Sequence, residues 1–600
     1  MNKASTDQET IAAYQALIEN MGRITAQCQE LVNAFSQQQP PSQPKATDID
    51  PFNISNTFIE LGKAMMANPE RLVQAQMSLM NQYADLWQKM LHNSGKPEKP
   101  EGQSTSGGKK GDRRFKDAAW EENPLFEHLK QAYLLTAQHI EKTVAETSGL
   151  DEKEARKAAF YTRQFVDSMS PSNFLLTNPE ALKETIDSKG ENLVRGLRNV
   201  IEDLKAGEGQ LKIRQTDTSA FEVGVNIATT PGKVVFRNEL MELIQYAPLT
   251  KTVFRRPLLI IPPWINKFYI LDLEPKNSFI RWSISKGYTV FVISWVNPDA
   301  KLAEKNFVNY MHEGIFAALD AIAMATGERE VNTVGYCIGG TLLASTLAYM
   351  AARGDKRIKA ATMLVAQVDF SEPGELEVFI DEEQINALDE KMSEKGYLES
   401  SSMSTTFNLL RANDLIWSFV VNNYLLGKEP YPFNLLYWNQ DSTRMPRAMH
   451  LFYLREMYLH NHLVKPGAIV FDDVPIDLTT IKVPMYLQSA REDHISPYPS
   501  VFKGGHHFQG PVRFIIAGSG HIAGVINPPA AHKYHYLVNE KQPDNLDEWL
   551  AGAEEHPGSW WPDWHRWLYR RSGKKIPARR PGDGQLKPLE DAPGSYVKMK

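Results

Sequence analysis

The chain has 600 residues, of which 42% are apolar and 23% charged, and its formal net charge is −6. This length allows two or three domains with a sizeable core, and so small a net charge gives no overall field that would mark nucleic acid or an anionic membrane as the partner. The only cysteines are Cys28 and Cys337, which excludes a disulfide-built fold and fits a reducing compartment.

The N-terminus, MNKASTDQETIAAYQ, has no apolar segment behind its lysine. No run of about 18 apolar residues occurs elsewhere in the chain. We therefore expect a cytoplasmic protein without a standard secretion signal and without a membrane span.

Residues 1–112 are predicted to form a helical N-terminal extension and a linker. A Gln/Pro/Ser stretch at 36–52 interrupts the polar, helical pattern, and a Gly/Ser/Pro/Lys segment at 93–115 has almost nothing to bury. Between Phe58 and Met90 apolar residues recur at helical spacing, with a break at Asn68-Pro69. We expect this stripe to be a packed face; a docking surface for a partner or a granule is the alternative.

Residues 113–218 are predicted to form a helical domain. Within it, the sequence LLTNPEALKETI offers Asn178 as an N-cap and Pro179 as the first helical residue.

After about residue 219, short β-rich runs alternate with helical patterns, which favours βα units and a mostly parallel sheet. The expected strands cover residues 257–262, 289–295, 331–336, 361–367, 484–490 and 512–517. The interval from 367 to 484 is too long for a simple connection, so we interpret about 370–480 as an inserted helical cap. We expect an α/β catalytic domain over 219–600 whose cap shields a substrate from water.

The sequence Gly335-Tyr336-Cys337-Ile338-Gly339 has the pattern of a nucleophile elbow, with cysteine where many hydrolases carry serine. A predicted strand precedes it and a predicted helix follows, so the helix N-terminus points at the sulfur and favours the thiolate. A buried structural cysteine is the alternative, but the context favours Cys337 as a nucleophile.

A nucleophile of this kind is followed along the chain by an acid and then by a histidine. His521 lies just after the last expected strand, whereas His506 and His507 precede that strand and read as exposed loop residues. Two acids compete, Asp493 and Asp369, each directly after a strand. We favour Asp493 because a single strand–helix–strand unit separates it from His521.

Two backbone N–H groups are candidates for an oxyanion hole. The first is that of Ile338, next to the nucleophile, and the second is that of Ile265, in the loop after an early strand. The chain has no HGGG motif, so the spacing supports the second donor less directly.

Sulfur in the nucleophile position favours acyl transfer over hydrolysis. Transfer from a thioester onto Cys337 exchanges one thiol for another, so the acyl group keeps its transfer potential. An alcohol can then accept the acyl group in a downhill step, provided that water is excluded.

Seven motifs together resemble the polyhydroxyalkanoate synthases, most closely class I, over about residues 112–600. They are PPWINKFYILDL, SWVNPD, GYCIGGT, FNLLYWNQDSTRMP, REDHISP, GHIAGVINPPA and GSWWPDW. The resemblance implies an α/β-hydrolase fold with an inserted helical cap, preceded by a helical N-terminal region. It implies a triad of Cys337, Asp493 and His521, oxyanion donors at Ile338 and Ile265, and a supporting role for His494 beside the acid.

The resemblance also implies the reaction. Members polymerise (R)-3-hydroxyacyl-CoA into polyester with release of CoA, and class I members favour short monomers such as 3-hydroxybutyryl-CoA. The implied partners are the CoA thioester substrate, the growing polyester granule, a second copy in a homodimer, and granule-associated proteins at the N-terminal region. No cofactor, metal or nucleic acid is expected, and the predicted location is the cytoplasm, at the granule surface.

Two other functions stay open at this point. The first is a cysteine-dependent hydrolase, such as a thioesterase or lactone hydrolase, and the second is a noncatalytic granule scaffold. The segment LRANDLIWSF, which contains Trp417, is a candidate for a gating or dimer surface of the cap or for a packed helix. The aromatic C-terminal sequence GSWWPDWHRWLYRR is expected to pack rather than to stack nucleic acid bases.

Overall fold

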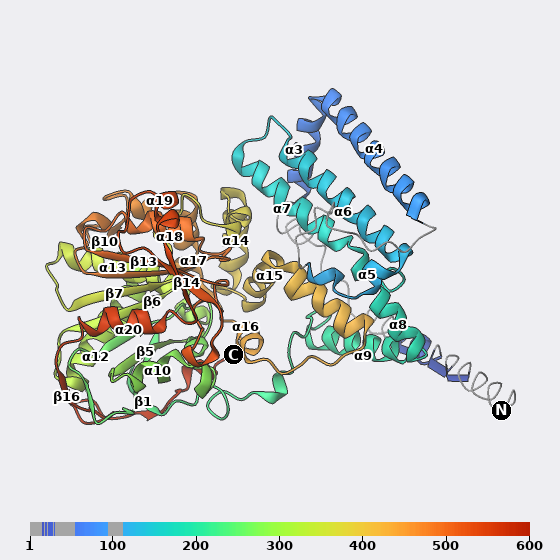
Figure 1. The fold of residues 1–600 in the computed structure, drawn as a ribbon. Helices are drawn as coiled ribbons and strands as arrows, with labels where there is room; N and C mark the ends of the chain where they lie inside the picture. The colour runs from blue at the N-terminus through green and yellow to red at the C-terminus, as the bar shows by residue number, and fades with distance from the viewer. Residues whose placement is uncertain (1–14, 17–18, 21, 28, 30–53, 94–111) are drawn as a thin grey trace. The chain divides into compact units, whose positions relative to one another are not determined.

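The structure, a computed structural model, describes residues 15–16, 19–20, 22–27, 29, 54–93 and 112–600 (Figure 1). The expected Gln/Pro/Ser stretch at 36–52 lies outside these residues, as does most of the expected linker at 93–115. The chain divides into two units. Unit 1 comprises Met1–Asp217 and Phe407–Tyr431, and unit 2 comprises Thr218–Thr406 and Pro432–Lys600.

Unit 1 is helical. Its main helices are α3 (Ile54–Met66), α4 (Pro69–Asn93), α5 (Ala119–Glu122), α6 (Pro124–Ala145), α7 (Glu152–Ser168), α8 (Pro179–Asp187) and α9 (Glu191–Ala206). The predicted break at Asn68-Pro69 is confirmed, because α3 ends at Met66 and α4 begins at Pro69. The predicted N-cap is also confirmed, since the Asn178 side chain accepts the N–H of Ala181 and Pro179 opens α8.

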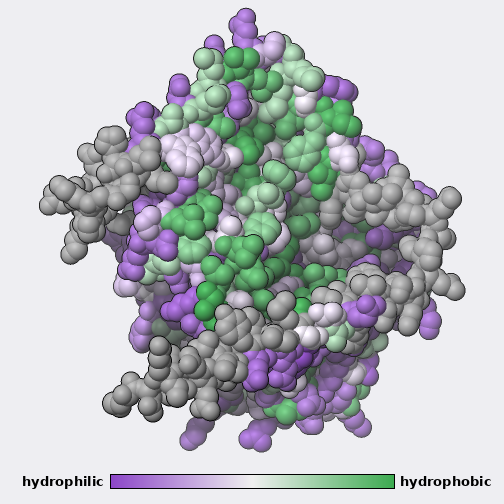
Figure 2. Space-filling view, turned by 90° about the vertical axis from the view of Figure 1, so that its right-hand side faces the viewer, coloured by the Kyte–Doolittle hydropathy of each residue, from purple (hydrophilic) through white to green (hydrophobic). Residues whose placement is uncertain are grey.

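The apolar stripe between Phe58 and Met90 is packed only in part. Leu61 is buried against α6 and α7, and the Tyr83 hydroxyl bonds to Thr136 of α6. Met80 and Trp87, by contrast, are 64% and 50% exposed. The prediction of a packed face is therefore wrong for these positions, because α6 covers only one side of α4. Figure 2 shows an apolar area with polar margins on the face of the molecule that it presents.

A distant piece of the chain completes unit 1. Residues 407–431, which include the π-helical segments η9 (Asn413–Trp417) and η10 (Val420–Leu425), join α9. The Asn192 side chain donates to the Leu425 carbonyl at 2.7 Å, and the Asn199 side chain donates to the Asn423 carbonyl at 3.0 Å. This piece belongs to the interval expected to form the cap, and Trp417 in η9 is half-buried.

Unit 2 is built on an 11-stranded mixed sheet. In spatial order its strands are β15 (Glu554–Pro557), β14 (His535–Val538), β13 (Val512–Ala517), β12 (Met485–Ala490), β7 (Ile358–Leu364), β6 (Val331–Tyr336), β4 (Leu258–Ile261), β5 (Val290–Trp295), β2 (Met241–Tyr246), β1 (Gly232–Arg237) and β17 (Glu590–Asp591).

The six strands from β13 to β5 are parallel and correspond to the six that the sequence predicts. Antiparallel strands extend the sheet at both edges, where β2 pairs with β5 and β14 pairs with β13. The parallel order brings the carboxyl ends of β4, β6, β7, β12 and β13 to one edge, and the loops that follow these strands carry the predicted site residues.

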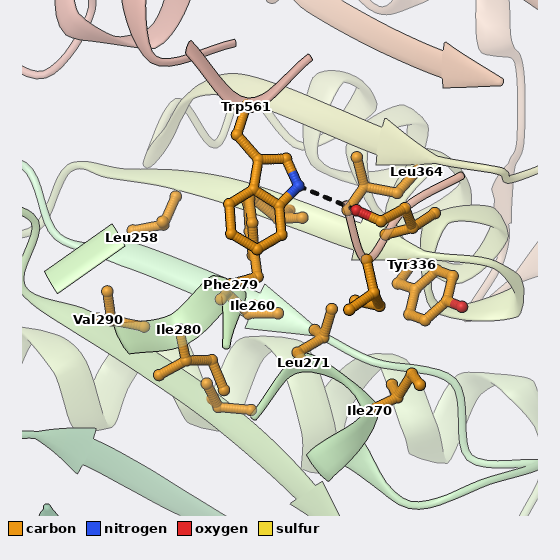
Figure 3. Close-up of a cluster of buried hydrophobic side chains, with 14 of the residues drawn as sticks. Leu258, Ile260, Ile270, Leu271, Phe279, Ile280, Val290, Tyr336, Leu364 and Trp561 are labelled. Carbon is orange, nitrogen blue, oxygen red and sulfur yellow. Dashed lines mark hydrogen bonds between the residues drawn. The ribbon is translucent and has the colours of Figure 1, made fainter. Parts of the chain in front are cut away.

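Helices lie on both sides of this sheet (Figure 1). They are α10 (Phe279–Ser285), α12 (Ala317–Thr326), α13 (Ile338–Ala352), α18 (Tyr498–Gly505), α19 (Leu546–Ala551) and α20 (Trp561–Tyr569). Figure 3 shows the core between them, where Trp561 donates its indole N–H to the Val525 carbonyl at 2.9 Å. Trp560 and Trp564 are also fully buried, so the prediction that the aromatic C-terminal sequence packs is confirmed.

The interval between β7 and β12 is mostly helical. In unit 2 it contains α14 (Glu382–Lys395), most of α15 (Ser400–Leu410), α16 (Asn434–Gln440), α17 (Arg447–Phe452) and the π-helical η11 (Tyr453–Leu459). Two short strand pairs also occur there, β8 (Tyr397–Leu398) with β9 (Met445–Pro446) and β10 (Val470–Phe471) with β11 (Val474–Pro475). Among the described residues, no helix is both long enough and apolar enough to cross a bilayer.

Candidate active site

Cys337 occupies the turn between β6 and α13, as the elbow pattern predicts. Its backbone has φ 51° and ψ −127°, a combination that an L-residue adopts only under strain. Two backbone bonds fix the turn, because the Cys337 N–H donates to the Leu364 carbonyl and the Cys337 carbonyl accepts the N–H of Gly340. The strained turn directs the side chain out of the strand, toward the carboxyl edge of the sheet.

The two glycines of the motif are required by close packing. A Cβ atom on Gly335 would lie 2.5 Å from the Cα of Gly340, and one on Gly339 would lie 2.3 Å from the Ile261 carbonyl oxygen. Real Cβ contacts are essentially never this short. Glycine at these positions allows α13 to start directly against the ends of β4 and β6, with its N-terminus at the sulfur.

Asp493 and His521, from the loops after β12 and β13, form the second part of the site. The Nδ1 atom of His521 lies 2.7 Å from Oδ2 of Asp493. The Asp493 side chain has no exposed area and that of His521 is 10% exposed. The other carboxylate oxygen of Asp493 accepts the N–H groups of Ile495 and Ser496, both at 2.9 Å. These bonds orient the acid toward the imidazole ring.

The Cys337 side chain lies close enough to the His521 ring to affect its pKa, so the ring lies near both the acid and the thiol. Burial alone would lower the pKa of His521, but Asp493 and Cys337 raise it from 6.5 to about 10. An imidazole ring between a carboxylate and a thiol is placed to move a proton to or from the sulfur. The structure thus brings the three residues of the predicted triad together, with a hydrogen bond between Asp493 and His521.

Three buried tyrosines lie near the sulfur, and no role is predicted for them from the sequence. They are Tyr336 at the end of β6 and Tyr453 and Tyr458 of η11. Burial raises the pKa of all three hydroxyls, and the nearby Cys337 raises each further. Tyr336 was visible in the motif, but no local pattern connects the other two with a cysteine more than 100 positions earlier.

Ile338 and Ile265, the candidate oxyanion donors, lie on neighbouring elements. Ile338 is the first residue of α13, and Ile265 lies in the loop after β4, which pairs in parallel with β6. In the part of the chain that the structure describes, neither N–H has a hydrogen-bond acceptor. Both groups are therefore compatible with the predicted role of oxyanion donors.

The loop that carries Ile265 is tied to the segment that follows α16. The Thr443 hydroxyl donates to the carbonyls of Trp264 and Ile265 at 2.5 and 2.6 Å. The Lys267 ammonium, 4% exposed, pairs with Asp441 at 2.8 Å. Burial lowers the pKa of Lys267, whereas Asp441 opposes that change. These contacts fix the loop beside the nucleophile turn.

Asp369, the rival acid, lies apart from His521. Its carboxylate accepts bonds from Asn461 at 2.9 Å and from His507 at 3.3 Å. Burial acts to raise the pKa of Asp369, but the bonds from His507, Ser371 and Asn461 hold it below its usual value. The geometry therefore selects Asp493 as the partner of His521. His507 is half-buried against Asp369, so its assignment as an exposed loop residue is wrong.

His494 follows the acid, and its carbonyl accepts the N–H of Glu375 at 3.0 Å. This bond ties the Asp493 loop to the loop after β7. Among the described residues, no group of three or more His, Cys, Asp or Glu side chains could hold a metal ion. The chemistry that the described side chains themselves offer is nucleophilic attack by sulfur with an imidazole to move the proton.

Two family profiles match the chain. One, described as the N-terminus of poly-beta-hydroxybutyrate polymerase, covers residues 111–283, and one for the alpha/beta hydrolase fold covers residues 266–528. The second agrees with the sheet order and with the position of the Cys337 turn.

Curated relatives match over nearly the whole chain. The chain is 52% identical over 557 residues to a poly(3-hydroxyalkanoate) polymerase of Methylorubrum extorquens, covering 92% of this chain and 91% of that protein. A poly(3-hydroxyalkanoate) polymerase subunit of Rhizobium meliloti strain 1021 is 45% identical to this chain. That match covers 100% of this chain and 98% of the relative. The corresponding subunit of Cupriavidus necator is 42% identical over 539 residues, 89% of each chain.

Proposed function

The chain belongs to the poly(3-hydroxyalkanoate) polymerase family, whose members join hydroxyacyl units into polyester, and on this premise we propose that it works through an acyl thioester on Cys337. The observation that carries the proposal is the Asp493–His521 hydrogen bond beside Cys337, whose side chain raises the pKa of the His521 ring. The proposed substrate is (R)-3-hydroxybutyryl-CoA or a similarly short 3-hydroxyacyl-CoA, in keeping with the resemblance to class I synthases.

The first half of the reaction loads the enzyme. The Cys337 thiolate attacks the thioester carbonyl, and the N–H groups of Ile338 and Ile265 hold the oxyanion of the tetrahedral intermediate. The bond between the carbonyl carbon and the CoA sulfur breaks, and the His521 imidazolium gives its proton to the departing CoA thiolate. Free CoA leaves, the acyl group stays on sulfur, and His521 is now neutral.

The second half extends the polymer. Neutral His521 takes the proton from the 3-hydroxyl group of another unit, and the resulting alkoxide attacks the acyl carbon on Cys337. An ester bond forms, the carbon–sulfur bond breaks, and the thiolate–imidazolium pair is restored. His521 acts as an acid in the first half and as a base in the second. The protons therefore balance over one cycle without a cofactor. Asp493 supports both states by orienting the ring and stabilising its cationic form.

Purified protein with 3-hydroxybutyryl-CoA tests this function. We expect release of free CoA thiol together with rising turbidity from insoluble polyester. Cys337→Ala should abolish both signals, and Cys337→Ser should reduce both strongly while leaving the fold intact. Thiol release with soluble 3-hydroxybutyrate and no polymer would instead identify a hydrolase, and unchanged activity of the Cys337→Ala variant would refute the proposed nucleophile.

We also propose that the enzyme works as a homodimer in the cytoplasm, bound to the surface of its own polyester granule. Support comes from the reaction itself, because a chain that grows on Cys337 becomes a water-insoluble solid attached to the protein. Sedimentation of polyester granules with the active enzyme tests this association, and light scattering of the soluble protein tests the dimer. Recovery of all the protein in the supernatant would contradict granule binding.

A further inference from the structure

A basic surface lies at the opposite edge of the sheet from Cys337. The short strands β3 (Thr252–Phe254) and β16 (Lys575–Pro577) pair antiparallel. Bonds beyond the strands keep the flanking segments together, because Arg255 N–H donates to the Lys574 carbonyl and Ala578 N–H to the Lys251 carbonyl. We call residues 251–256 and 570–580 the basic ribbon. Its sequences, KTVFRR and RRSGKKIPARR, contain nine basic residues and no acidic one.

Few carboxylates neutralise this ribbon. Glu328 pairs with both Arg255 and Arg579, and Glu330 pairs with Arg256. In the described part of the chain, no carboxylate forms an ion pair with the other basic side chains of the ribbon: Lys251, Arg570, Arg571, Lys574, Lys575 and Arg580. The ribbon is therefore strongly positive although the whole chain has a net charge of −6.

Two guanidinium groups in the ribbon have buried donors without an acceptor. The Nε atom of Arg571 and one terminal nitrogen of Arg579 have no hydrogen-bond partner among the described residues. Burial lowers the pKa of both groups. Arg570 lowers that of Arg571 further, and at Arg579 the opposing effect of Glu328 is offset by Arg255. Buried donors of this kind normally have partners, so both guanidinium groups keep hydrogen-bonding capacity that the described residues do not use.

Aromatic rings beneath the ribbon hold its cations in place. The Arg571 guanidinium lies 4.3 Å from the Trp567 ring centroid, and the Lys575 ammonium lies 5.1 Å from that of Phe254. Lys286 lies 5.4 Å from the Trp282 ring and adds a further positive charge. Burial lowers the pKa of His565, and Lys286 and Lys575 lower it further, which places both lysines near the same ring. Cations held on rings lose less entropy when they bind an anion.

The position of the ribbon separates it from the active site. Arg256 lies two residues before β4 and Glu330 directly precedes β6, so the ribbon lies where these parallel strands begin. Cys337 follows the end of β6. Six residues at about 3.3 Å each put roughly 20 Å of strand between them. The ribbon is thus an independent surface, and what it binds does not rest on the proposed function.

The surface chemistry indicates the class of ligand. The cations follow an extended ribbon and are mostly exposed, which suits a chain of negative charges better than a single ion. Tyr569, beside the ribbon, is 53% exposed, and no large apolar side chain of the ribbon itself is exposed. One ring gives no platform for successive bases and nothing to insert into a bilayer. We propose that the basic ribbon binds a flexible, base-free chain of phosphates, with inorganic polyphosphate as the ligand.

Binding of the full-length protein to fluorescently labelled inorganic polyphosphate tests the proposal. The variant Arg570→Gln/Lys574→Gln/Lys575→Gln removes three cations without ion pairs. The matched control, Arg156→Gln/Lys395→Gln/Lys503→Gln, removes three cations that are paired with Glu152, Glu399 and Glu372. We expect the control to bind like wild type and the ribbon variant to bind about tenfold or more weakly, with a shallower dependence on salt.

Two further measurements keep the result unambiguous. Arg570→Lys/Lys574→Arg/Lys575→Arg keeps the charge and should keep the binding, and all of these variants should release CoA at the wild-type rate. Absence of polyphosphate binding at physiological salt, or equal weakening in the control, overturns the proposal. Ribbon-dependent binding of duplex DNA or anionic vesicles in place of polyphosphate overturns the choice of ligand.

Discussion

His521 Nδ1 lies 2.7 Å from Asp493 Oδ2, and Asp369, the other candidate acid, bonds to His507 instead. The structure thus separates two carboxylates that follow neighbouring strands and look alike in the sequence. Their exchange for the isosteric amide provides a matched pair of variants.

Asp493→Asn should reduce CoA release by about 10³- to 10⁴-fold, because an amide favours the wrong imidazole tautomer and cannot stabilise the cation. Asp369→Asn should stay within a few-fold of wild type, since its partners lie outside the triad. Rates of thiol release from 3-hydroxybutyryl-CoA give the comparison. Equal losses in the two variants would contradict the assignment of the acid.

The raised pKa of His521 makes stability depend on pH. The folded state holds the proton up to about pH 10, whereas the unfolded chain releases it near 6.5. The contribution of His521 to the free energy of unfolding is therefore complete below about pH 6.5 and is lost as the pH rises toward 10. We expect the melting temperature of wild type to fall toward that of His521→Gln over this range. A constant difference between the two melting curves would show that the ring is neutral.

Gly339→Ala should destabilise unit 2 by about 3 kcal/mol. Its Cβ atom would meet the Ile261 carbonyl oxygen at 2.3 Å, and a backbone atom inside the sheet cannot retract. Gly62→Ala in α3 is the control, because nothing lies within 4 Å of the added Cβ, and it should stabilise that helix by about 0.5–1 kcal/mol. Calorimetric melting of both variants measures the effects. A Gly339→Ala protein that melts like wild type would refute the close approach of α13 to β4.

Asp441→Ala should lower the free energy of unfolding by about 3–5 kcal/mol, because it leaves the buried Lys267 ammonium without its counter-charge. Since Lys267 lies in the loop that carries Ile265, CoA release should also slow. The double variant Lys267→Met/Asp441→Leu removes both charges and should recover part of the lost stability. If the double variant is less stable than Asp441→Ala, loss of the counter-charge is not the cause of the destabilisation in Asp441→Ala. Melting temperature and the rate of thiol release are the two readouts.

The sequence predicts the central sheet well, because each parallel strand is a short apolar run bounded by turn residues. The turn at Cys337 is predicted for a similar reason, since only glycine fits on its two sides. The edge strands were missed. β15 carries two glutamates and a histidine in EEHP, and such a strand has no apolar pattern that would set it apart from a loop.

Contacts between distant segments could not be predicted. Tyr453 and Tyr458 lie in a helix that reads as ordinary core, and only the three-dimensional fold brings them to the sulfur. Met80 and Trp87 are predicted to be packed but are exposed. Spacing identifies an apolar face but does not show whether a neighbour covers it. His507 was read as exposed because the sequence does not reveal its partner Asp369.

The attachment of residues 407–431 to α9 affects how the nascent chain folds. Asn192 and Leu425 bond to each other although they are 233 positions apart. At about 5–20 residues per second, α9 emerges from the ribosome roughly 10 to 50 s before its partner is made. Until then α9 exposes side chains that are polar and become buried in the finished fold, namely Asn192, Asn199 and Asp203. Water can satisfy these groups during translation, so the exposed helix stays soluble until its partner arrives.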